Sequence, residues 1–372
     1  MHTYTIPLVP GPTAVRPEVL AAYQVNYGSA DLEPEYPLLY SETEILLHNL
    51  LGTGNRIAIL SGEGMVALWG ALKSTLCPGD RVVAVATGFF GFGIADMARA
   101  IGAHVDTVDF GFDEAATDLD RVADAIRRVR PKMVTLVHCE TPSGIINPAA
   151  EVGALVREYD VPLYYVDVVS SLGGMALETD AWGIDLCLGA TQKALSSLPD
   201  LGIVAVSDRA WDIIEAVNYQ GYDALLPFRA PPAVGGFPYT PNWHALAALY
   251  TSCSLLLAEG LTAVYARHEA IARRWRESLE ALGLTLFPRD PATNAPTVTA
   301  VKLPETVSWP DLDAALRRRG MVVGGSYGPL AGQVFRVGHM GAQASEALWH
   351  EGIRTLSAAL RELGLPVNEV TP

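Results

Sequence analysis

Short apolar runs alternate with stretches of helical spacing between residues 56 and 206. The apolar runs are rich in β-branched residues and predict strands at Arg56–Leu60, Arg81–Thr87, His104–Val108, Met133–His138, Pro162–Asp167, Ile184–Leu188 and Leu201–Val206. Apolar residues at helical spacing predict helices at Met65–Leu76, Ile94–Ile101, Leu119–Val129 and Ala149–Tyr159. This alternation predicts an α/β fold with a mostly parallel sheet that is covered on both faces. Ligands of such sheets bind at the carboxyl ends of the strands.

The pattern changes after about residue 245, where a long helical stretch is predicted at Ala245–Leu282. The elements predicted after it are strand Thr297–Leu303, helix Trp309–Arg319, strands Met321–Gly325 and Gln333–Gly338, and helix Ser345–Leu363. They form a smaller α+β unit packed on the first. The segment Tyr219–Pro241 is rich in Gly, Pro and aromatic residues and predicts an irregular connection near a site. We therefore expect an N-terminal arm (1–20), a large domain (21–250) and a small domain (251–372).

The composition is that of a folded protein with a large core. The chain has 372 residues, of which 50% are hydrophobic and 18% charged. That hydrophobic content excludes a disordered chain. No apolar run approaches the ~18–20 residues that a bilayer span requires. The first residues lack a basic region followed by an apolar core, so we expect no secretory signal.

The charge balance argues against a nucleic-acid partner. The net charge is −15, from 26 basic and 41 acidic residues, and binding many phosphates needs clustered Lys and Arg. Two small basic groups lie on predicted helices beside acidic residues and are expected to form solvated faces. They are Arg127, Arg128 and Arg130, and Arg317, Arg318 and Arg319.

Cysteine spacing excludes two further classes of site. Cys77, Cys139, Cys187 and Cys253 show no CxxC pair and no histidine at metal-ligand spacing. We therefore expect no disulfide framework and no zinc site, and a reducing cytoplasm fits best. Cys139 is expected to be a small buried hydrophobic residue.

Lys193 is the most informative residue of the sequence. It follows an apolar strand and stands in Gly189-Ala190-Thr191-Gln192-Lys193. A lysine just beyond a buried strand is partly desolvated, which lowers its pKa and favours the neutral amine that condenses with an aldehyde. A surface lysine in a loop is the alternative that this segment alone leaves open.

Asp167 ends another apolar strand, Pro162–Asp167. A buried carboxylate costs several kcal/mol unless it meets a cation or hydrogen-bond donors. A protonated pyridine nitrogen is such a partner, and the protonated ring acts as an electron sink. Ordinary helix capping by this Asp is the alternative.

Three further segments carry candidate ligand groups, each with a plain structural alternative. Ser61-Gly62-Glu63-Gly64-Met65 joins a strand to a helix, so its amides can approach an anion, although the segment taken alone favours a plain tight turn. His138–Gly144, with sequence HCETPSG, follows a strand and can offer hydroxyls, or be an ordinary polar turn. Arg336 is the one charged residue in an apolar strand and suits a substrate carboxylate, or a structural ion pair.

Together these segments resemble the class V, fold type I pyridoxal-phosphate aminotransferases, and within them the alanine–glyoxylate and serine–pyruvate group. Asp167 precedes Lys193 by 26 residues, with HCETPSG upstream and Val334–Gly341 (VFRVGHMG) near the C-terminus. The resemblance covers essentially the whole chain, from Pro10-Gly11-Pro12-Thr13 onward. It implies a large domain with a seven-stranded sheet, a small C-terminal domain and a homodimer. It also implies transamination between a small amino acid, alanine or serine, and glyoxylate or pyruvate.

The resemblance assigns roles around the ring of pyridoxal 5′-phosphate. Lys193 would form the internal aldimine, and Asp167 would pair with the pyridine nitrogen. Val169 and Phe90 would contact the two faces of the ring. Thr141 would hydrogen-bond the ring hydroxyl or nearby groups.

It also assigns roles at the phosphate and at the substrate. Gln192, Gly64 and Met65 would contact the phosphate, the last two through backbone amides. Thr240 would be lent to this phosphate by the neighbouring subunit. Arg336 would hold the substrate carboxylate.

Departures from the family pattern leave a second function open. Glu63 stands where many relatives carry Ser or Thr, and a carboxylate beside a phosphate is unfavourable unless donors separate them. Met65 replaces a histidine of some relatives, and Phe237 replaces a tyrosine that donates to the phosphate. Pyridoxamine–pyruvate transaminases are similar in having Glu at this place, and they act on an unphosphorylated vitamer.

Other classes fit the sequence less well. A cysteine desulfurase needs a nucleophilic cysteine in a mobile loop, and none of the four cysteines is so placed. A nicotinamide dehydrogenase needs GxGxxG after its first strand, and Gly88–Gly93 has a different glycine spacing. A non-catalytic binding protein on the same fold remains open, although such a protein is expected to lack the lysine.

Overall fold

A seven-stranded sheet forms the larger part of the molecule, and the order of its strands is β2-β10-β9-β8-β5-β3-β4. The computed structural model describes residues 3–368. The strands are β2 (Arg56–Ser61), β3 (Arg81–Ala86), β4 (His104–Asp109), β5 (Met133–Val137), β8 (Leu163–Asp167), β9 (Leu186–Ala190) and β10 (Leu201–Val206). Only β10 runs antiparallel to its neighbours β9 and β2. The predicted fold class is confirmed, with each strand within two residues of its predicted start.

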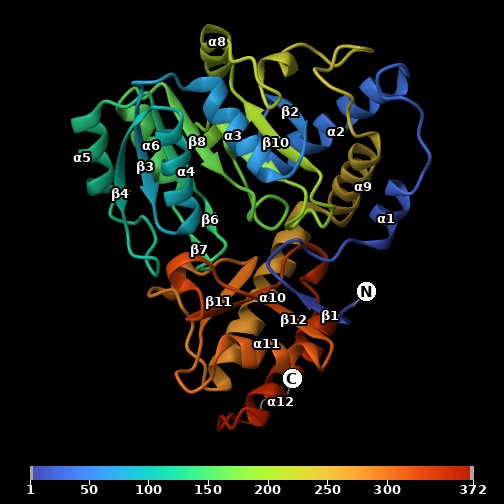
Figure 1. The fold of residues 1–372 in the computed structure, drawn as a ribbon, viewed down its shortest axis with the longest axis vertical. Coiled ribbons are helices and arrows are strands. Elements are labelled where there is room, and N and C mark those ends of the chain that lie inside the picture. Colours follow the sequence, from blue (N-terminus) through green and yellow to red (C-terminus); the bar gives the residue numbers. More distant parts are fainter. Residues whose placement is uncertain (1–2, 369–372) are drawn as a thin grey trace.

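Helices cover both faces of this sheet (Figure 1). They are α1 (Pro17–Tyr23), α2 (Glu35–Leu51), α3 (Gly64–Thr75), α4 (Phe89–Ala100), α5 (Leu119–Val129), α6 (Ala149–Glu158), α7 (Thr179–Trp182), α8 (Asp208–Val217) and α9 (Trp243–Glu259). Helix α4 begins five residues before its predicted start, because Phe89–Gly93 has no apolar periodicity that marks a helix. A two-stranded hairpin of β6 (Cys139–Glu140) and β7 (Ile145–Ile146) follows β5.

The smaller unit has its own sheet and its own core. Its strand order is β1-β12-β13-β11. The elements are β1 (Ile6–Leu8), β11 (Val298–Lys302), β12 (Met321–Gly325), β13 (Val334–Gly338), α10 (Leu261–Ala281), α11 (Trp309–Arg317) and α12 (Glu346–Glu362), with short 3₁₀ helices at Pro291–Thr293, Gly328–Leu330 and Gly341–Gln343. Another 3₁₀ helix, Leu226–Phe228, belongs to the larger unit, where it contacts α8 and β2. Trp275 and Phe335 are fully buried in this core. The N-terminal β1 pairs with β12 in parallel, so the first strand and the last helix of the described chain, β1 and α12, both lie in this unit (Figure 1).

The single helix predicted at Ala245–Leu282 is wrong, because the chain forms two helices, α9 and α10. Gly260 lies between them with a φ of 86°, a conformation that glycine adopts at little steric cost. The two axes differ by 87°. Among the described helices, none is by itself long and apolar enough to cross a bilayer, and only this bent pair passes that test jointly.

Both predicted basic groups lie at the surface, and Cys139 is buried as predicted. The two basic groups form ion pairs with nearby acidic residues on the surface, including Arg128 with Asp106 at 2.8 Å and Arg318 with Glu362 at 2.6 Å. All four cysteines are free thiols. Cys139 is only 2% exposed.

Candidate active site

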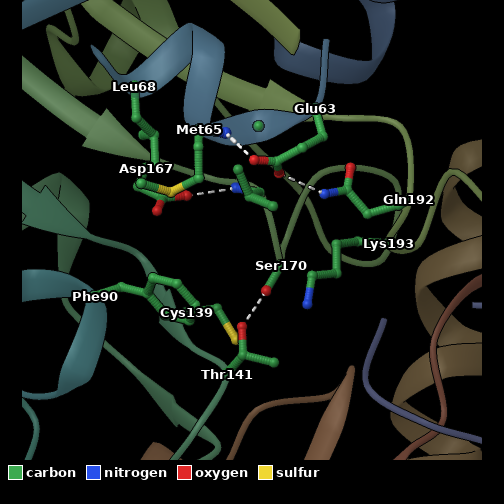
Figure 2. A pocket seen from close by; sticks show the side chains of 12 residues that line it. Glu63, Met65, Leu68, Phe90, Cys139, Thr141, Asp167, Ser170, Gln192 and Lys193 are labelled. Carbon is green, nitrogen blue, oxygen red and sulfur yellow. Dashed lines mark hydrogen bonds between the residues drawn. The ribbon is translucent and has the colours of Figure 1, made fainter. Parts of the chain in front are cut away.

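A single cavity at the carboxyl edge of the large sheet brings together most of the predicted site residues (Figure 2). The strands β2, β3, β5, β8 and β9 all end at this edge, and each is followed by a segment that contributes to the cavity. The predicted residues that line it are Glu63, Gly64, Met65, Phe90, Thr141, Asp167, Val169, Gln192 and Lys193. Leu68, Cys139 and Ser170 complete the lining.

Lys193 points its amine into this cavity from the segment after β9 (Figure 2). Its Nζ donates a hydrogen bond to the Pro10 carbonyl at 2.5 Å. Burial, and after it the positive charge of Arg336, lower the pKa of the amine to about 8, although Asp167 and Glu63 act in the opposite direction. A substantial fraction of the amine is therefore neutral near pH 7. The alternative of a surface lysine in a loop is excluded.

Asp167 is buried at the end of β8, with an exposed fraction of 5%. Its Oδ1 accepts the backbone N–H of Val169 at 2.8 Å. Burial raises the pKa of the carboxyl, and although this hydrogen bond and the charge of Lys193 act in the opposite direction, the net pKa is about 6. Asp167 caps no helix in the described chain, so a cation in the cavity would be its natural partner.

Glu63 occupies the start of α3. Its Oε1 accepts the Met65 backbone N–H at 3.0 Å, and its Oε2 accepts the Gln192 side-chain amide at 3.0 Å (Figure 2). The helix N-terminus stabilises this carboxylate. The other end of the Gln192 amide, Oε1, is buried without a hydrogen-bond partner among the described residues. The cavity therefore presents acceptor oxygens at the place where the sequence predicts phosphate ligands.

Two hydroxyls and two apolar side chains lie between these charged groups. Thr141 and Ser170 are buried and share a hydrogen bond between their hydroxyls (Figure 2). Phe90, at the start of α4, and Val169, just after β8, are both partly buried in the lining. The sequence analysis did not single out Ser170, since one serine beside a strand end carries no signal of its own.

Arg336 lies beside the cavity in β13 and is 3% exposed. Its Nε donates to the Gly325 carbonyl at 2.7 Å, and its Nη1 donates to the Thr141 carbonyl at 3.4 Å. The Tyr327 ring covers the guanidinium, 4.7 Å from ring centroid to Cζ. Arg336 has no acidic partner within residues 3–368, so the structural ion pair is excluded and the guanidinium suits a carboxylate ligand.

Thr240 lies outside the cavity of its own chain. Its hydroxyl donates to Asp31 Oδ2 at 3.1 Å on an exposed part of the surface. The expectation that Thr240 serves a phosphate therefore requires a second copy of the chain, and it stays a prediction.

The N-terminal arm contributes backbone groups that the sequence analysis missed. The Pro10 carbonyl accepts from Lys193, and the Thr13 hydroxyl donates to the Lys193 carbonyl at 2.8 Å. Gly11 has a φ of 112°, and a Cβ at this position would come within 2.6 Å of Lys193 Nζ. Proline and glycine in this arm signal a turn, but no periodicity indicates which element the turn approaches.

Known proteins match the chain over nearly its full length. The family model described as Aminotransferase class-V matches residues 20–339. The pyridoxamine–pyruvate transaminase of Mesorhizobium japonicum is 32% identical, over 96% of this chain and 92% of that protein. The alanine–glyoxylate aminotransferase of Oryctolagus cuniculus is 31% identical, over 95% and 91%. The crystal structure of pyridoxamine–pyruvate aminotransferase from Mesorhizobium loti superposes with a TM-score of 0.93 at 29% identity, over 98% of this chain and 94% of that one.

Proposed function

Because the chain belongs to the class-V aminotransferase family, we propose that Lys193 is the residue that binds the pyridoxal cofactor of this aminotransferase. The enzyme transfers an amino group between an amino acid and a 2-oxo acid, and its family implies pyridoxal phosphate as the cofactor. The observation that carries the assignment is the pairing of a lysine amine of lowered pKa with a buried carboxylate, Asp167, in one cavity.

The described residues fit the ring of the cofactor. Asp167 is a buried carboxylate whose Oδ2 has no hydrogen bond within the described chain, which suits a protonated ring nitrogen. Phe90 and Val169 offer apolar surface for the two ring faces, and Thr141 and Ser170 offer hydroxyls for polar groups at the ring edge. Together, this carboxylate, the two apolar surfaces and the two hydroxyls suit a flat ring with a protonated nitrogen and polar groups at its edge.

The bound cofactor supplies an aldehyde and an electron-accepting ring. Lys193 would hold the cofactor through this aldehyde, since its pKa of about 8 makes the neutral amine available. Asp167 holds the proton on the ring nitrogen and thereby maintains the electron demand of the ring. The same amine would be the group that moves a proton between the substrate α-carbon and the C4′ atom of the cofactor.

Arg336 is proposed to bind the carboxylate that amino acids and 2-oxo acids share. Its guanidinium is fixed by the Gly325 and Thr141 carbonyls and covered by Tyr327, so it is preorganised for a bidentate contact. A small donor, alanine or serine, with glyoxylate or pyruvate as acceptor, agrees with the alanine–glyoxylate relative.

The substrate assignment is tested by steady-state assays with the cofactor-loaded protein. Alanine, serine, aspartate and glutamate are offered as donors, each with glyoxylate and with pyruvate. We expect the highest kcat/KM for alanine or serine with glyoxylate or pyruvate. Preference for a dicarboxylic donor by tenfold or more would overturn this substrate class and leave the transaminase assignment intact.

A second candidate function is favoured by Glu63. Its carboxylate occupies the helix N-terminus and takes up N–H groups of Met65 and Gln192 that a phosphate would need. The buried Gln192 Oε1 has no donor within residues 3–368, and a hydroxyl can supply one whereas a phosphate dianion cannot. These groups suit the hydroxymethyl of unphosphorylated pyridoxamine, the substrate in the name of the 32% identical relative.

The two candidates differ in what the purified protein retains. A yellow protein that releases pyridoxal phosphate on denaturation supports the amino-acid aminotransferase. A colourless protein that converts free pyridoxamine with pyruvate supports the second candidate. In that case Glu63→Gln is expected to raise KM for pyridoxamine, because a charge-assisted hydrogen bond to its hydroxyl is lost.

A homodimer is proposed as the active unit. Leu32, Leu38 and Ile45 lie on or near α2 and are 72%, 64% and 59% exposed. Burying such side chains stabilises by about 1.5–3 kcal/mol each, and a second copy of the chain would cover them. The same assembly would bring Thr240 to the phosphate of the partner, a role that its own chain does not allow.

The remaining partner and location assignments stay proposals. We infer an amino acid and a 2-oxo acid as small-molecule partners, and neither nucleic acid nor membrane, because the net charge of the chain is −15. A cytoplasmic location agrees with four free thiols, of which only Cys77 is exposed.

A further inference from the structure

Glu140 is a buried carboxylate that the proposed chemistry does not use. It ends β6, is 0% exposed, and does not line the cavity. A carboxylate in such a place costs several kcal/mol unless donors satisfy it. Its partners therefore show what it stabilises.

Both oxygens of Glu140 accept backbone N–H groups from the first turn of α4. Oε1 accepts from Gly91 at 2.7 Å, and Oε2 accepts from Phe90 at 3.2 Å. The residue at the start of this helix, Gly88, has no side chain to cap it, so Glu140 caps α4 from another element. Burial and the charge of Asp167 raise the pKa of Glu140, the two N–H groups lower it, and the net pKa is about 7.

Two glycines permit this close approach. A Cβ at Gly88 would lie 2.7 Å from Glu140 Cδ, and a Cβ at Gly91 would lie 3.2 Å from Glu140 Oε1 and 3.0 Å from the Ala86 Cα. Gly88 has an extended backbone, with a φ of −176°, so the side chain of Glu140 is what restricts this position.

The residues after Glu140 connect to the substrate side of the site. Thr141 lines the cavity, and its carbonyl accepts from Arg336. The Pro142 carbonyl accepts the hydroxyl of Ser326, from the loop after β12, at 3.0 Å. The turn is closed by the Gly144 N–H, which donates to the Glu140 carbonyl at 2.8 Å. The side chain of Glu140 thus holds Phe90, while its backbone turn holds the groups around Arg336.

We propose that Glu140 is a positioning residue that fixes Phe90 against one face of the cofactor ring. The proposal rests on the proposed function, since it assigns Phe90 to that ring face. Only a carboxylate offers acceptors to both N–H groups; a glutamine would accept one and turn its own NH₂ donor toward the other. The start of α4 would then shift, and Phe90 with it.

The test is a double-mutant cycle between Glu140→Gln and Phe90→Leu, with the dissociation constant of pyridoxal phosphate for the ligand-free protein as the readout. Losing a hydrogen bond to a charged group predicts roughly tenfold weaker binding for Glu140→Gln. In the Phe90→Leu background we expect the same change to cost less than about twofold, because the ring contact is already lost. Equal losses in both backgrounds, or no loss in either, would overturn the proposal.

Amide hydrogen exchange of the ligand-free variants provides a readout that does not depend on the cofactor. Glu140→Gln is expected to speed exchange at Phe90 and Gly91. Gly88→Ala displaces the Glu140 side chain without altering its chemistry, so it is expected to show the same faster exchange and weaker binding. Unchanged exchange in both variants would contradict the capping role.

A matched control is Asp118→Asn. Asp118 caps α5, where its Oδ1 accepts the backbone N–H of Arg121 at 3.4 Å, so this variant also replaces a capping carboxylate by an amide. It is expected to lower thermal stability slightly and to leave cofactor affinity unchanged. If the wild-type protein binds no pyridoxal compound, the proposed function fails. If the wild type binds and Glu140→Gln binds equally well, only the present inference fails.

Discussion

Asp167 and Lys193 line the same cavity from neighbouring strand ends, and the charge of each shifts the pKa of the other. The carboxylate raises the pKa of the amine, the amine lowers that of the carboxyl, and burial acts in the opposite direction on both. The net result is a carboxyl with a pKa of about 6 and an amine with a pKa of about 8. Near neutral pH the Asp167 carboxyl is therefore mostly ionised and can pair with the ring nitrogen, and a fraction of the Lys193 side chains carries a neutral amine.

The lowered pKa of Lys193 predicts how fast the ligand-free protein captures the cofactor at different pH values. Only the neutral amine attacks the aldehyde, and its fraction falls about tenfold per pH unit below the pKa of about 8. The capture rate, followed by stopped-flow absorbance, should therefore rise with pH up to about 8 and level off above it. A rate that keeps rising to pH 10 would show a lysine of ordinary pKa.

Replacing Asp167 by Asn should slow transamination severely. The shape is kept, but the charge that holds the proton on the ring nitrogen is lost. Rates should fall by ~10²–10⁴, the size typical of lost proton-transfer and electrostatic roles. Single-turnover kinetics with saturating amino acid measure this step directly. Asp180→Asn, at an Asp that binds the Gly54 N–H away from the cavity, is the matched control. A rate within a factor of a few of wild type would exclude the assigned role of Asp167.

Replacing Arg336 by Lys should raise KM for both the amino acid and the oxo acid. The positive charge remains, but the planar fork for a carboxylate is lost. A hydrogen bond to a charged group contributes about 1.5–3 kcal/mol, so KM should rise roughly 10- to 150-fold. Arg318→Lys, at a surface pair with Glu362, should leave KM unchanged. Equal KM values for the two variants would remove Arg336 from the substrate site.

Introducing charge on α2 should separate the subunits. Leu38 and Ile45 are one heptad apart, on one face of the helix, and both are exposed in the single chain. Leu38→Glu combined with Ile45→Glu should convert a dimer to a monomer in light scattering and weaken cofactor retention, because Thr240 would no longer reach the partner. A wild-type protein that is fully active as a monomer would contradict this assembly.

Periodicity predicts the large sheet well because its strands are buried on both faces, which leaves continuous apolar runs such as Met133–Val137 and Leu201–Val206. Periodicity predicts element boundaries less well where a backbone conformation, and not the side-chain pattern, ends or begins an element. Gly260 divides a stretch whose apolar spacing continues through the break. The three-residue β1 is too short to show any pattern, although it carries the arm that reaches Lys193.

The candidate site was largely predictable because its residues follow strand ends, where a buried polar side chain is conspicuous. Asp167 and Arg336 stand out for that reason. Contacts made by backbone atoms leave no such signal, so the Pro10 carbonyl was missed. Glu140 is not conspicuous because it lies within a polar turn, and its partners are the N–H groups of Phe90 and Gly91, 50 and 49 residues earlier in the chain.

The central claim, that Lys193 carries the cofactor, is tested most directly by locating the attachment. The protein is loaded with pyridoxal phosphate, or with pyridoxal if the second candidate function holds, reduced with borohydride, digested and examined by mass spectrometry. The account predicts that the visible absorbance band disappears on reduction and that the added mass lies on the peptide containing Lys193. Lys193→Ala should show neither the band nor the adduct, and should have no transaminase activity although it remains folded by circular dichroism. An adduct on another lysine, or wild-type turnover by Lys193→Ala, would contradict the account.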